Sequence, residues 1–334
     1  MRIVKQKGVA LIAILIVLVL ASLILTSYVV REAQVLDDQL RRKATDRLLL
    51  LGLSTEGWIR QQLVIDARQT NSDTLTEPWA QEVTALPVEG GVLNGRLIDL
   101  DRFVNLNRFT AYTEKKYEVE SEKDNSDISL IERVFAQAQI ALPTGALESL
   151  IDWQDRDKSS TRGGFESVDY QLLDPPYRAA DGALSDLAEL HLVNGFEQVE
   201  LSRLANVAVA LPDDLLSVNV NTAPKEVLAA LWDGIDDDAA ATLIAMRESQ
   251  SWGAVTDFID DLAQLLGAEK SLVEQALNRD GYSVISVNSK YFYLDIKLRL
   301  DDIEMWYRST LNRRVDGEAI SVSVESRSVT YEAI

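Results

Sequence analysis

The chain has 334 residues, of which 47% are hydrophobic, and a formal net charge of −20 at pH 7, with one histidine and no cysteine. This composition excludes disulfides, thiolate metal sites and a cysteine nucleophile, and the single histidine makes a histidine-based triad or a zinc site of several histidines nearly impossible. The acidic charge disfavours general binding to nucleic acid. The length can bury a sizeable core, and the abundant carboxylates suit a hard cation such as calcium.

An uncharged apolar segment, residues 9–30, follows the basic residues Arg2, Lys5 and Lys7. As a helix it would be roughly 33 Å long, which is enough to cross a bilayer core. The basic residues before it predict a cytoplasmic N-terminus and a translocated remainder. A cleavable secretory signal would be shorter and would end in a small-residue cleavage motif, so a single-pass anchor fits better.

The start of this segment offers a further reading. Gly8 stands between the basic leader and the apolar run, in the order Lys7-Gly8-Val9-Ala10. This arrangement resembles the type IV prepilin class, in which a membrane peptidase cuts after such a glycine and the apolar helix stays on the mature protein. The alternative is a plain membrane anchor with an incidental glycine.

Beyond the apolar segment the helical pattern continues. Apolar residues recur every three or four positions and form a stripe that includes Leu36, Leu40, Ala44 and Leu48,. We therefore predict one helix from Val9 to about Arg68, half of it in lipid. The stripe is expected to be the interface with partner helices.

Two distant parts of the chain predict strands. Residues 92–104 read as a strand or hairpin, with Asn94-Gly95 as the turn signal,. Residues 282–311 show the clearest alternation of apolar and polar side chains in the chain, and residues 320–324 add an edge strand,.

The chain between these strands reads as helical and is punctuated by prolines,. The predicted helices are 128–142, 147–153, 184–193, 199–208, 223–232, 237–248, 255–265 and 270–277. The predicted fold class is α+β: a long N-terminal helix packed on a small antiparallel sheet, with a large all-α domain inserted between the strands.

A series of short motifs occurs in a characteristic order. They are Gly8-Val9-Ala10-Leu11-Ile12, Leu97-Ile98-Asp99, Val104-Asn105-Leu106-Asn107, Asp152-Trp153-Gln154-Asp155-Arg156-Asp157, Gly164-Phe165-Glu166, Tyr170, Tyr177-Arg178-Ala179-Ala180, Glu189-Leu190, Val218-Asn219-Val220-Asn221-Thr222-Ala223 and Ser289-Lys290-Tyr291-Phe292. In this order, over nearly the whole chain, they resemble the K-type minor pseudopilins of type II secretion, the general secretion pathway protein K family.

The resemblance implies a pilin-like fold with its own division of the chain. Residues 1–8 would be the prepilin leader, 9–30 the transmembrane helix and 31–70 the periplasmic part of the same helix. Residues 71–108 and 282–334 would form the sheet, and 109–281 the inserted helical domain, with a helix-hairpin-helix or SAM-like part at 219–265.

The resemblance also implies a function in assembly and no enzymatic activity. Prepilin peptidase would cleave after Gly8, and Val9 would be N-methylated. The mature protein would sit in the bacterial inner membrane with its C-terminal domain in the periplasm. There it would join I- and J-type minor pseudopilins at the tip of the pseudopilus. Major pilins carry glutamate at the fifth mature position, where this chain has Ala13.

An acidic segment after residue 151 predicts a calcium site. Counted from Asp155, oxygen-bearing residues occupy positions 1, 3, 5, 7 and 12, which is EF-hand-like spacing, although Ser160 replaces the usual glycine at position 6,. The family resemblance implies structural Ca²⁺ held by Asp152, Asp155, Asp157 and Glu166, with Asp169 as a further ligand. The alternative is a solvated acidic loop.

The helix-hairpin-helix resemblance at 219–265 raises a second function, that of a periplasmic DNA-binding protein of the competence type. Four aspartates, at 233 and 236–238, crowd the hairpin where such modules contact phosphate, which opposes DNA binding,. Paired acids elsewhere could suggest a hydrolase, but nothing in the sequence converges on them. We therefore favour a protein-contact role without nucleic acid.

Overall fold

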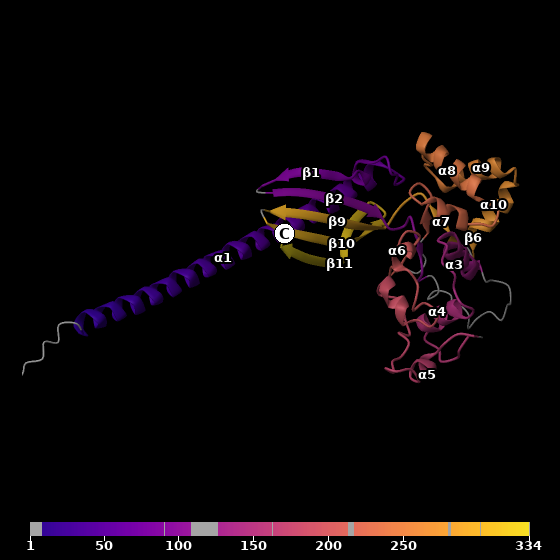
Figure 1. Cartoon of the computed structure of the whole chain (residues 1–334). Helices are drawn as coiled ribbons and strands as arrows, with labels where there is room; N and C mark the ends of the chain where they lie inside the picture. The colour runs from indigo at the N-terminus through magenta and orange to yellow at the C-terminus, as the bar shows by residue number, and fades with distance from the viewer. Residues whose placement is uncertain are drawn as a thin grey trace, which may run out of the picture.

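The computed structural model describes residues 9–89, 91–107, 126–161, 163–212, 217–279, 282–300 and 302–333. Helix α1 (Val9–Gln69) is a single rod that projects away from a sheet, and the helical region lies at the opposite end of that sheet (Figure 1). This confirms the prediction of one helix from Val9 to about Arg68. All side chains from residue 11 to residue 43 are exposed. Among the described residues, α1 is the one helix long and apolar enough to span a membrane.

The second half of α1 packs against a five-stranded antiparallel sheet. The strand order is β1-β2-β9-β10-β11, with bounds β1 (Val83–Val88), β2 (Gly91–Asp99), β9 (Tyr291–Leu300), β10 (Ile303–Asp316) and β11 (Ala319–Ala333). Strands β2 and β9 are hydrogen-bonded neighbours, with Leu97 opposite Leu294. The chain therefore leaves the sheet after β2 and returns to the adjacent position at β9, which agrees with the predicted α+β class.

The alternating pattern of the last strands produces the core of this sheet. Phe292, Leu294, Ile296 and Leu298 point to one face and are at most 2% exposed, because successive strand residues face opposite sides,. They pack with Leu48 and other residues of α1 in one cluster. A short 3-10 helix, η1 (Pro78–Ala80), adds Trp79, whose ring meets Phe292 edge-on at 5.3 Å.

The prediction of a turn at Asn94-Gly95 is wrong. Both residues lie inside β2, and the chain reverses between Val88 and Gly91 instead, so β1 is a strand that the sequence reading missed. Its side chains are mostly exposed and it contains Pro87. An edge strand can accept proline and needs no apolar alternation, so it leaves little signal in the sequence.

The helical region has a separate hydrophobic core. Its helices are α3 (Ser126–Gln137), α4 (Ala146–Gln154), α5 (Ser167–Tyr170), η2 (Leu187–Leu192), α6 (Leu201–Leu204), α7 (Lys225–Ala230), α8 (Asp237–Ser249), α9 (Val255–Leu266) and α10 (Lys270–Leu277). Among the described residues, three pairs of two-residue strands complete it, of which β3 (Val104–Asn105) with β4 (Ala208–Val209) and β5 (Val218–Asn219) with β8 (Ile285–Ser286) are parallel. The remaining pair joins β6 (Asn278–Arg279) to β7 (Tyr282–Ser283).

Three predicted elements differ from the structure. The helix expected at 199–208 is the single turn α6 followed by β4, and the helix expected at 184–193 is the shorter 3-10 helix η2. The edge strand expected at 320–324 is the much longer β11. Short apolar runs do not distinguish helix from strand by periodicity, and tertiary pairing decided these segments.

Candidate functional site

The loop between α4 and α5 holds the acidic residues for which the sequence predicts calcium. Helix α4 ends at Gln154, Asp155 caps its C-terminus, and α5 begins at Ser167. One carboxylate oxygen from each of Asp155, Asp157 and Glu166 lies within 4.8 Å of the others. Because oxygen ligands lie about 2.3–2.6 Å from Ca²⁺, three oxygens at this spacing can share one ion.

The burial of these carboxylates fits a cation. Asp155 is 5% exposed and Glu166 is 3% exposed. Among the described residues, Oδ1 of Asp155 and Oε1 of Glu166 are buried without a hydrogen-bond partner. A buried carboxylate oxygen that is left unpaired is costly, and a hard cation would supply the missing partner.

The electrostatics of the loop agree with this fit. Burial, together with the negative charges of Asp157, Glu166 and Asp152, raises the pKa of Asp155 to about 7. Burial is also the main cause of the raised pKa values of Asp152 and Glu166. The ionised carboxylates repel one another here, so a bound cation would favour their charged forms.

Two of the predicted ligands hold the loop in place. Asp152 accepts the Thr161 amide on Oδ1 at 2.9 Å and on Oδ2 at 3.0 Å. A Cβ on Gly164 would lie 2.1 Å from Oδ2 of Asp152, so this position requires glycine. Asp169 caps α5, where its Oδ2 accepts the Glu166 amide at 2.9 Å. The structure thus groups three of the five predicted carboxylates and gives the other two hydrogen bonds to backbone amides.

Aromatic packing holds the two ends of the loop together. The Trp153 ring at the end of α4 meets the Tyr170 ring at the end of α5 edge-on, with centroids 5.2 Å apart. Nε1 of Trp153 donates to Oε1 of Glu189 at 2.9 Å. The loop is therefore closed by packing at its base, which positions the acidic side chains before any ion binds.

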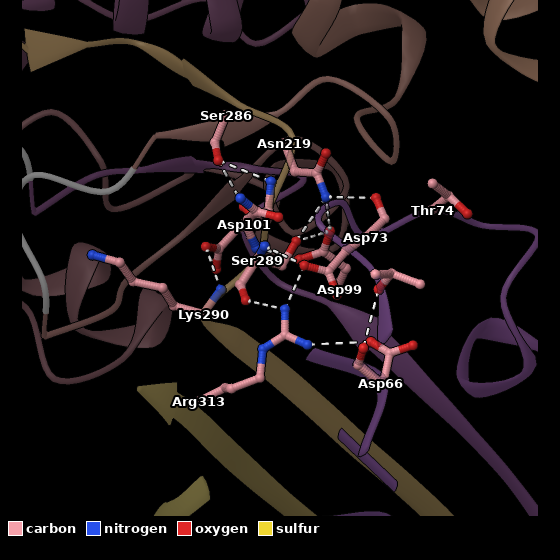
Figure 2. Close-up of polar contacts among 12 residues, drawn as sticks. Asp66, Asp73, Thr74, Asp99, Asp101, Asn219, Ser286, Ser289, Lys290 and Arg313 are labelled. Carbon is pink, nitrogen blue, oxygen red and sulfur yellow. Dashed lines mark hydrogen bonds and ion pairs between the residues drawn. The ribbon is translucent and has the colours of Figure 1, made fainter. Parts of the chain in front are cut away.

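A second polar group, which sequence reasoning missed, lies where the sheet meets the helical region (Figure 2). We call it the junction cluster, and it consists of Asp73, Asp99, Asp101, Asn219, Thr222, Ser289 and Arg313. All seven residues are at most 4% exposed. Asp99, Asn219 and Ser289 belong to three motifs that carried the family resemblance, and the fold brings these motifs together.

Asp99 is the centre of the junction cluster. Its Oδ2 accepts hydrogen bonds from the hydroxyls of Thr222 and Ser289, the latter at 2.7 Å, and from Nδ2 of Asn219 at 3.2 Å. Despite these donors, burial raises the pKa of Asp99 to about 6. Burial and the neighbouring charge of Asp99 raise the pKa of Asp101 as well.

Arg313 connects the junction cluster to the end of α1. Its guanidinium is ion-paired with Asp73 and also contacts Oδ2 of Asp66 at 3.3 Å (Figure 2). It donates to the Ser289 carbonyl at 2.7 Å and lies over the Phe292 ring at 4.9 Å. A buried arginine with this set of partners fixes the approach of four chain segments.

The predicted interface stripe on α1 is partly wrong. Leu36 and Leu40 are each 57% exposed, whereas Leu48 is 1% exposed and packs on the sheet, and Ala44 is half-buried beside it. At about 100° per residue, position 48 turns toward the sheet, while Leu50 and Trp58 stay on the face of Leu36 and Leu40. Leu50 is 63% exposed and Trp58 is 60% exposed.

The predicted processing site lies at the edge of what the structure describes. Gly8 is outside the described residues, and Val9 is the first residue of α1.

The hairpin from α7 to α8 uses its aspartates within the fold. The Asp236 side chain caps α8 by accepting the Ala239 amide at 2.8 Å. Asp237 is ion-paired with Lys225 at 2.7 Å, and Asp233 with Arg133 at 3.2 Å. Acidic side chains thus surround the hairpin and give its surface a negative charge.

Two family models match the chain, both described as type II secretion system (T2SS), protein K. They match residues 102–213 and 218–284, together more than half of the chain. The chain is 28% identical over 321 residues to a type II secretion system protein K of Pseudomonas aeruginosa, covering 94% of this chain and 90% of the relative. It is 24% identical to the protein of that description from Pectobacterium carotovorum subsp. carotovorum, with 95% of each chain covered.

The fold is also similar to a solved structure. A chain in the crystal structure of the GspK-GspI-GspJ complex from the enterotoxigenic Escherichia coli type 2 secretion system superposes with a TM-score of 0.69. The match has 23% sequence identity and covers 86% of this chain and 98% of that one. The long helix, the antiparallel sheet and the helical region thus occur together in a known fold. Family models, relatives and fold agree with the order of motifs in the sequence, and the chain belongs to the protein K family of type II secretion systems.

Proposed function

We propose that this protein is a minor pseudopilin that assembles with I- and J-type minor pseudopilins at the tip of the type II secretion pseudopilus. In this position it would act in protein export across the outer membrane. The role is structural and not enzymatic, in keeping with relatives that are named as secretion system components.

The observation that carries this proposal is the uncovered face of α1. Leu36, Leu40, Leu50 and Trp58 lie on one side of the helix, and each is at least 57% exposed. In the second half of α1, the sheet covers the opposite side of the helix. Large apolar side chains in a row along an exposed helix face are typical of a surface that packs against another helix.

The sequence at the start of α1 supports a place at the end of a filament. Residues 9–30 contain no acidic side chain, and position 13 is alanine. In major pilins a glutamate at the corresponding position pairs with the N-terminus of a neighbour. A subunit with nothing above it has no such partner, and an unpaired carboxylate in lipid would be costly.

Co-expression of the full chain with candidate I- and J-type pseudopilins tests this assembly. We expect a complex that survives affinity purification in detergent and contains all three chains. Binding of the protein to duplex DNA at moderate salt, without capture of pseudopilins, would instead support the competence-type alternative. The aspartates around the hairpin of α7 and α8 oppose that alternative, and we propose a protein-contact role for residues 219–265.

Processing and topology complete the proposal. Cleavage after Gly8 by prepilin peptidase would leave Val9, N-methylated, as the first residue of the inner-membrane helix, with the C-terminal domain in the periplasm. Mass analysis of the protein from its native membrane checks this. Retention of residues 1–8 would show that the protein is a plain anchor.

We further propose that the loop of Asp155, Asp157 and Glu166 binds structural Ca²⁺. When bound, the ion would neutralise carboxylates that otherwise repel one another, while Asp152 and Asp169 hold the loop in shape. The expected result is a drop in melting temperature on chelation, which Asp157→Asn would reduce or abolish. An unchanged melting curve with and without chelator would remove the proposal.

A further inference from the structure

A second group of carboxylates lies outside the predicted calcium loop, at the far end of α1. Asp66 is in the last turn of α1, Asp73 in the loop that follows, and Glu77 just before η1. One oxygen from each lies within 4.8 Å of the others. The spacing of these acids in the sequence does not predict a metal site, because the chain must bend back after α1 to bring them together.

The side chains of this group are held in place from outside. Oδ2 of Asp73 is ion-paired with Arg313 and accepts the Ser289 amide at 2.7 Å. Oε2 of Glu77 accepts the Thr74 amide at 3.1 Å and Nε1 of Trp79 at 2.6 Å. These contacts orient the carboxylates without using all of their oxygens.

One oxygen within the group has no partner. Asp73 is 2% exposed, and among the described residues its Oδ1 is buried without a hydrogen bond. Asp73 also lines a cavity of about 840 Å³, together with Thr70 and Asn71. Asp66 and Glu77 do not line this cavity, which therefore lies beside the group, and the unpaired Oδ1 of Asp73 is the observation that points to a bound ligand.

The charges of the group are not balanced. Asp66, Asp73 and Glu77 face one guanidinium, that of Arg313, so the formal charge is negative by two when all are ionised. Burial and the charge of Asp73 raise the pKa of Asp66, and burial raises that of Glu77. A divalent cation would supply the missing charge.

The donor atoms indicate the type of cation. Oxygens within 4.8 Å of one another are compatible with the ligand distances of about 2.3–2.6 Å and the flexible geometry of Ca²⁺, whereas Mg²⁺ requires about 2.0–2.1 Å and near-ideal octahedral geometry,. Three carboxylate oxygens, with no histidine or cysteine among them, favour a hard cation over a transition metal.

We propose that Asp66, Asp73 and Glu77 form a divalent-cation site for a calcium-sized ion, separate from the loop after α4. The ion joins the last turn of α1 to the loop that follows it and to η1. Through Asp73 it also reaches Arg313 and Ser289 of the junction cluster. From this position the ion would stabilise the orientation of the helical region relative to α1.

Terbium luminescence in the full chain tests the site, because Tb³⁺ takes calcium sites and is sensitised by a nearby tryptophan. The background carries Asp155→Asn, Asp157→Asn and Glu166→Gln, which disable the acidic loop. Trp79 contacts Glu77 directly and serves as the donor. We expect Tb³⁺ emission that saturates and that falls when excess Ca²⁺ displaces the Tb³⁺. The substitution Trp79→Phe should abolish the emission, and Trp58→Phe should leave it unchanged.

Ligand variants in this background complete the test. Glu77→Gln keeps an oxygen to accept from Thr74 and Trp79 and is expected to weaken calcium uptake in equilibrium dialysis by about a hundredfold or more. Asp73→Asn is expected to do the same, and circular dichroism checks that each variant is folded. Uptake by folded Glu77→Gln equal to that of the background would overturn the proposal, as would a background without calcium uptake.

Discussion

Arg313 is a buried residue whose contacts join distant segments of the chain. Its guanidinium pairs with Asp73 and Asp66, and its side chain is 4% exposed. Next to it in the same strand, Arg314 is exposed. Two neighbouring arginines thus differ only in which face of β10 they occupy, and this difference gives them different energetic roles.

We expect Arg313→Gln to lower the free energy of unfolding by about 3–5 kcal/mol, because it leaves the buried carboxylate of Asp73 and the half-buried one of Asp66 without the guanidinium,. Arg314→Gln, the matched control, should change it by less than about 0.5 kcal/mol. Urea denaturation of a fragment of residues 31–334, which lacks the apolar segment, measures both. Equal effects of the two substitutions would contradict the role given to Arg313.

Asp99 makes the stability of the protein depend on pH. Its pKa is about 6 in the folded chain, above its ordinary value of 3.8. The folded state therefore binds the proton more tightly than the unfolded state does. The stabilisation is fully present below about pH 4 and is lost as the pH rises to about 6. Since one pKa unit corresponds to about 1.4 kcal/mol, the raised pKa of Asp99 among its acidic neighbours corresponds to a loss on the order of 3 kcal/mol,.

The comparison of wild type with Asp99→Asn isolates this effect from that of other carboxyl groups. Asparagine stays neutral, so the variant should lose less stability than the wild type between pH 4 and pH 6.5. Urea midpoints across this range provide the measurement. Parallel curves for the two proteins would show that folding does not raise the pKa of Asp99.

At the scale of elements, the packing of α1 on the sheet depends on a close approach at one point. A Cβ at Gly52 would lie 2.6 Å from the ring of Tyr307 on β10. The hydroxyl of Tyr307 donates to Oε2 of Glu56 at 2.7 Å, and Arg327 of β11 pairs with the same carboxylate at 2.7 Å. Glycine at position 52 thus allows the helix to come close enough for Glu56 to bind both strands.

Gly52→Ala and Gly57→Ala form a matched pair within one helix. The first places a methyl group against Tyr307 and should destabilise the protein by about 1–3 kcal/mol. The second meets nothing within 4 Å and should stabilise it by about 0.5–1 kcal/mol, because alanine favours helix over glycine,. Thermal or urea unfolding distinguishes them, and a loss of stability in Gly57→Ala would contradict the packing described here.

At the scale of the whole molecule, α1 serves both as part of the core and as the proposed assembly surface. Leu48 belongs to the core and Leu50 is exposed, although only one residue separates them. The rod can therefore present an apolar face to partner helices without weakening its own attachment to the sheet. This division suits a subunit that folds first and assembles afterwards.

Leu48→Ala should affect folding stability, and Leu50→Ala should affect assembly. Loss of the buried side chain is expected to cost about 2–5 kcal/mol of folding stability. Loss of the exposed one should leave stability within about 0.5 kcal/mol and reduce co-purification with I- and J-type pseudopilins. Undiminished capture by Leu50→Ala combined with Trp58→Ala would place the interface on another face of α1.

Several features of this protein follow from the sequence by itself. The uncharged segment 9–30, the continuous helix to residue 69, the alternation in β9 and the acidic loop are local patterns, and local backbone and hydrophobic preferences are sufficient to predict them. The order of motifs, read as a resemblance, identified the family. Composition also excluded cysteine chemistry and opposed any site of several histidines before any fold was known.

Only the tertiary structure decided which distant residues meet. Edge strand β1, the junction cluster and the carboxylates of Asp66, Asp73 and Glu77 leave no periodic signal, because their partners lie in other parts of the chain. The face of α1 that the sheet covers was likewise undetermined: an apolar stripe predicts burial but not whether the covering surface belongs to the same chain. Leu48 and Leu50 received their different roles from the position of the sheet against the helix.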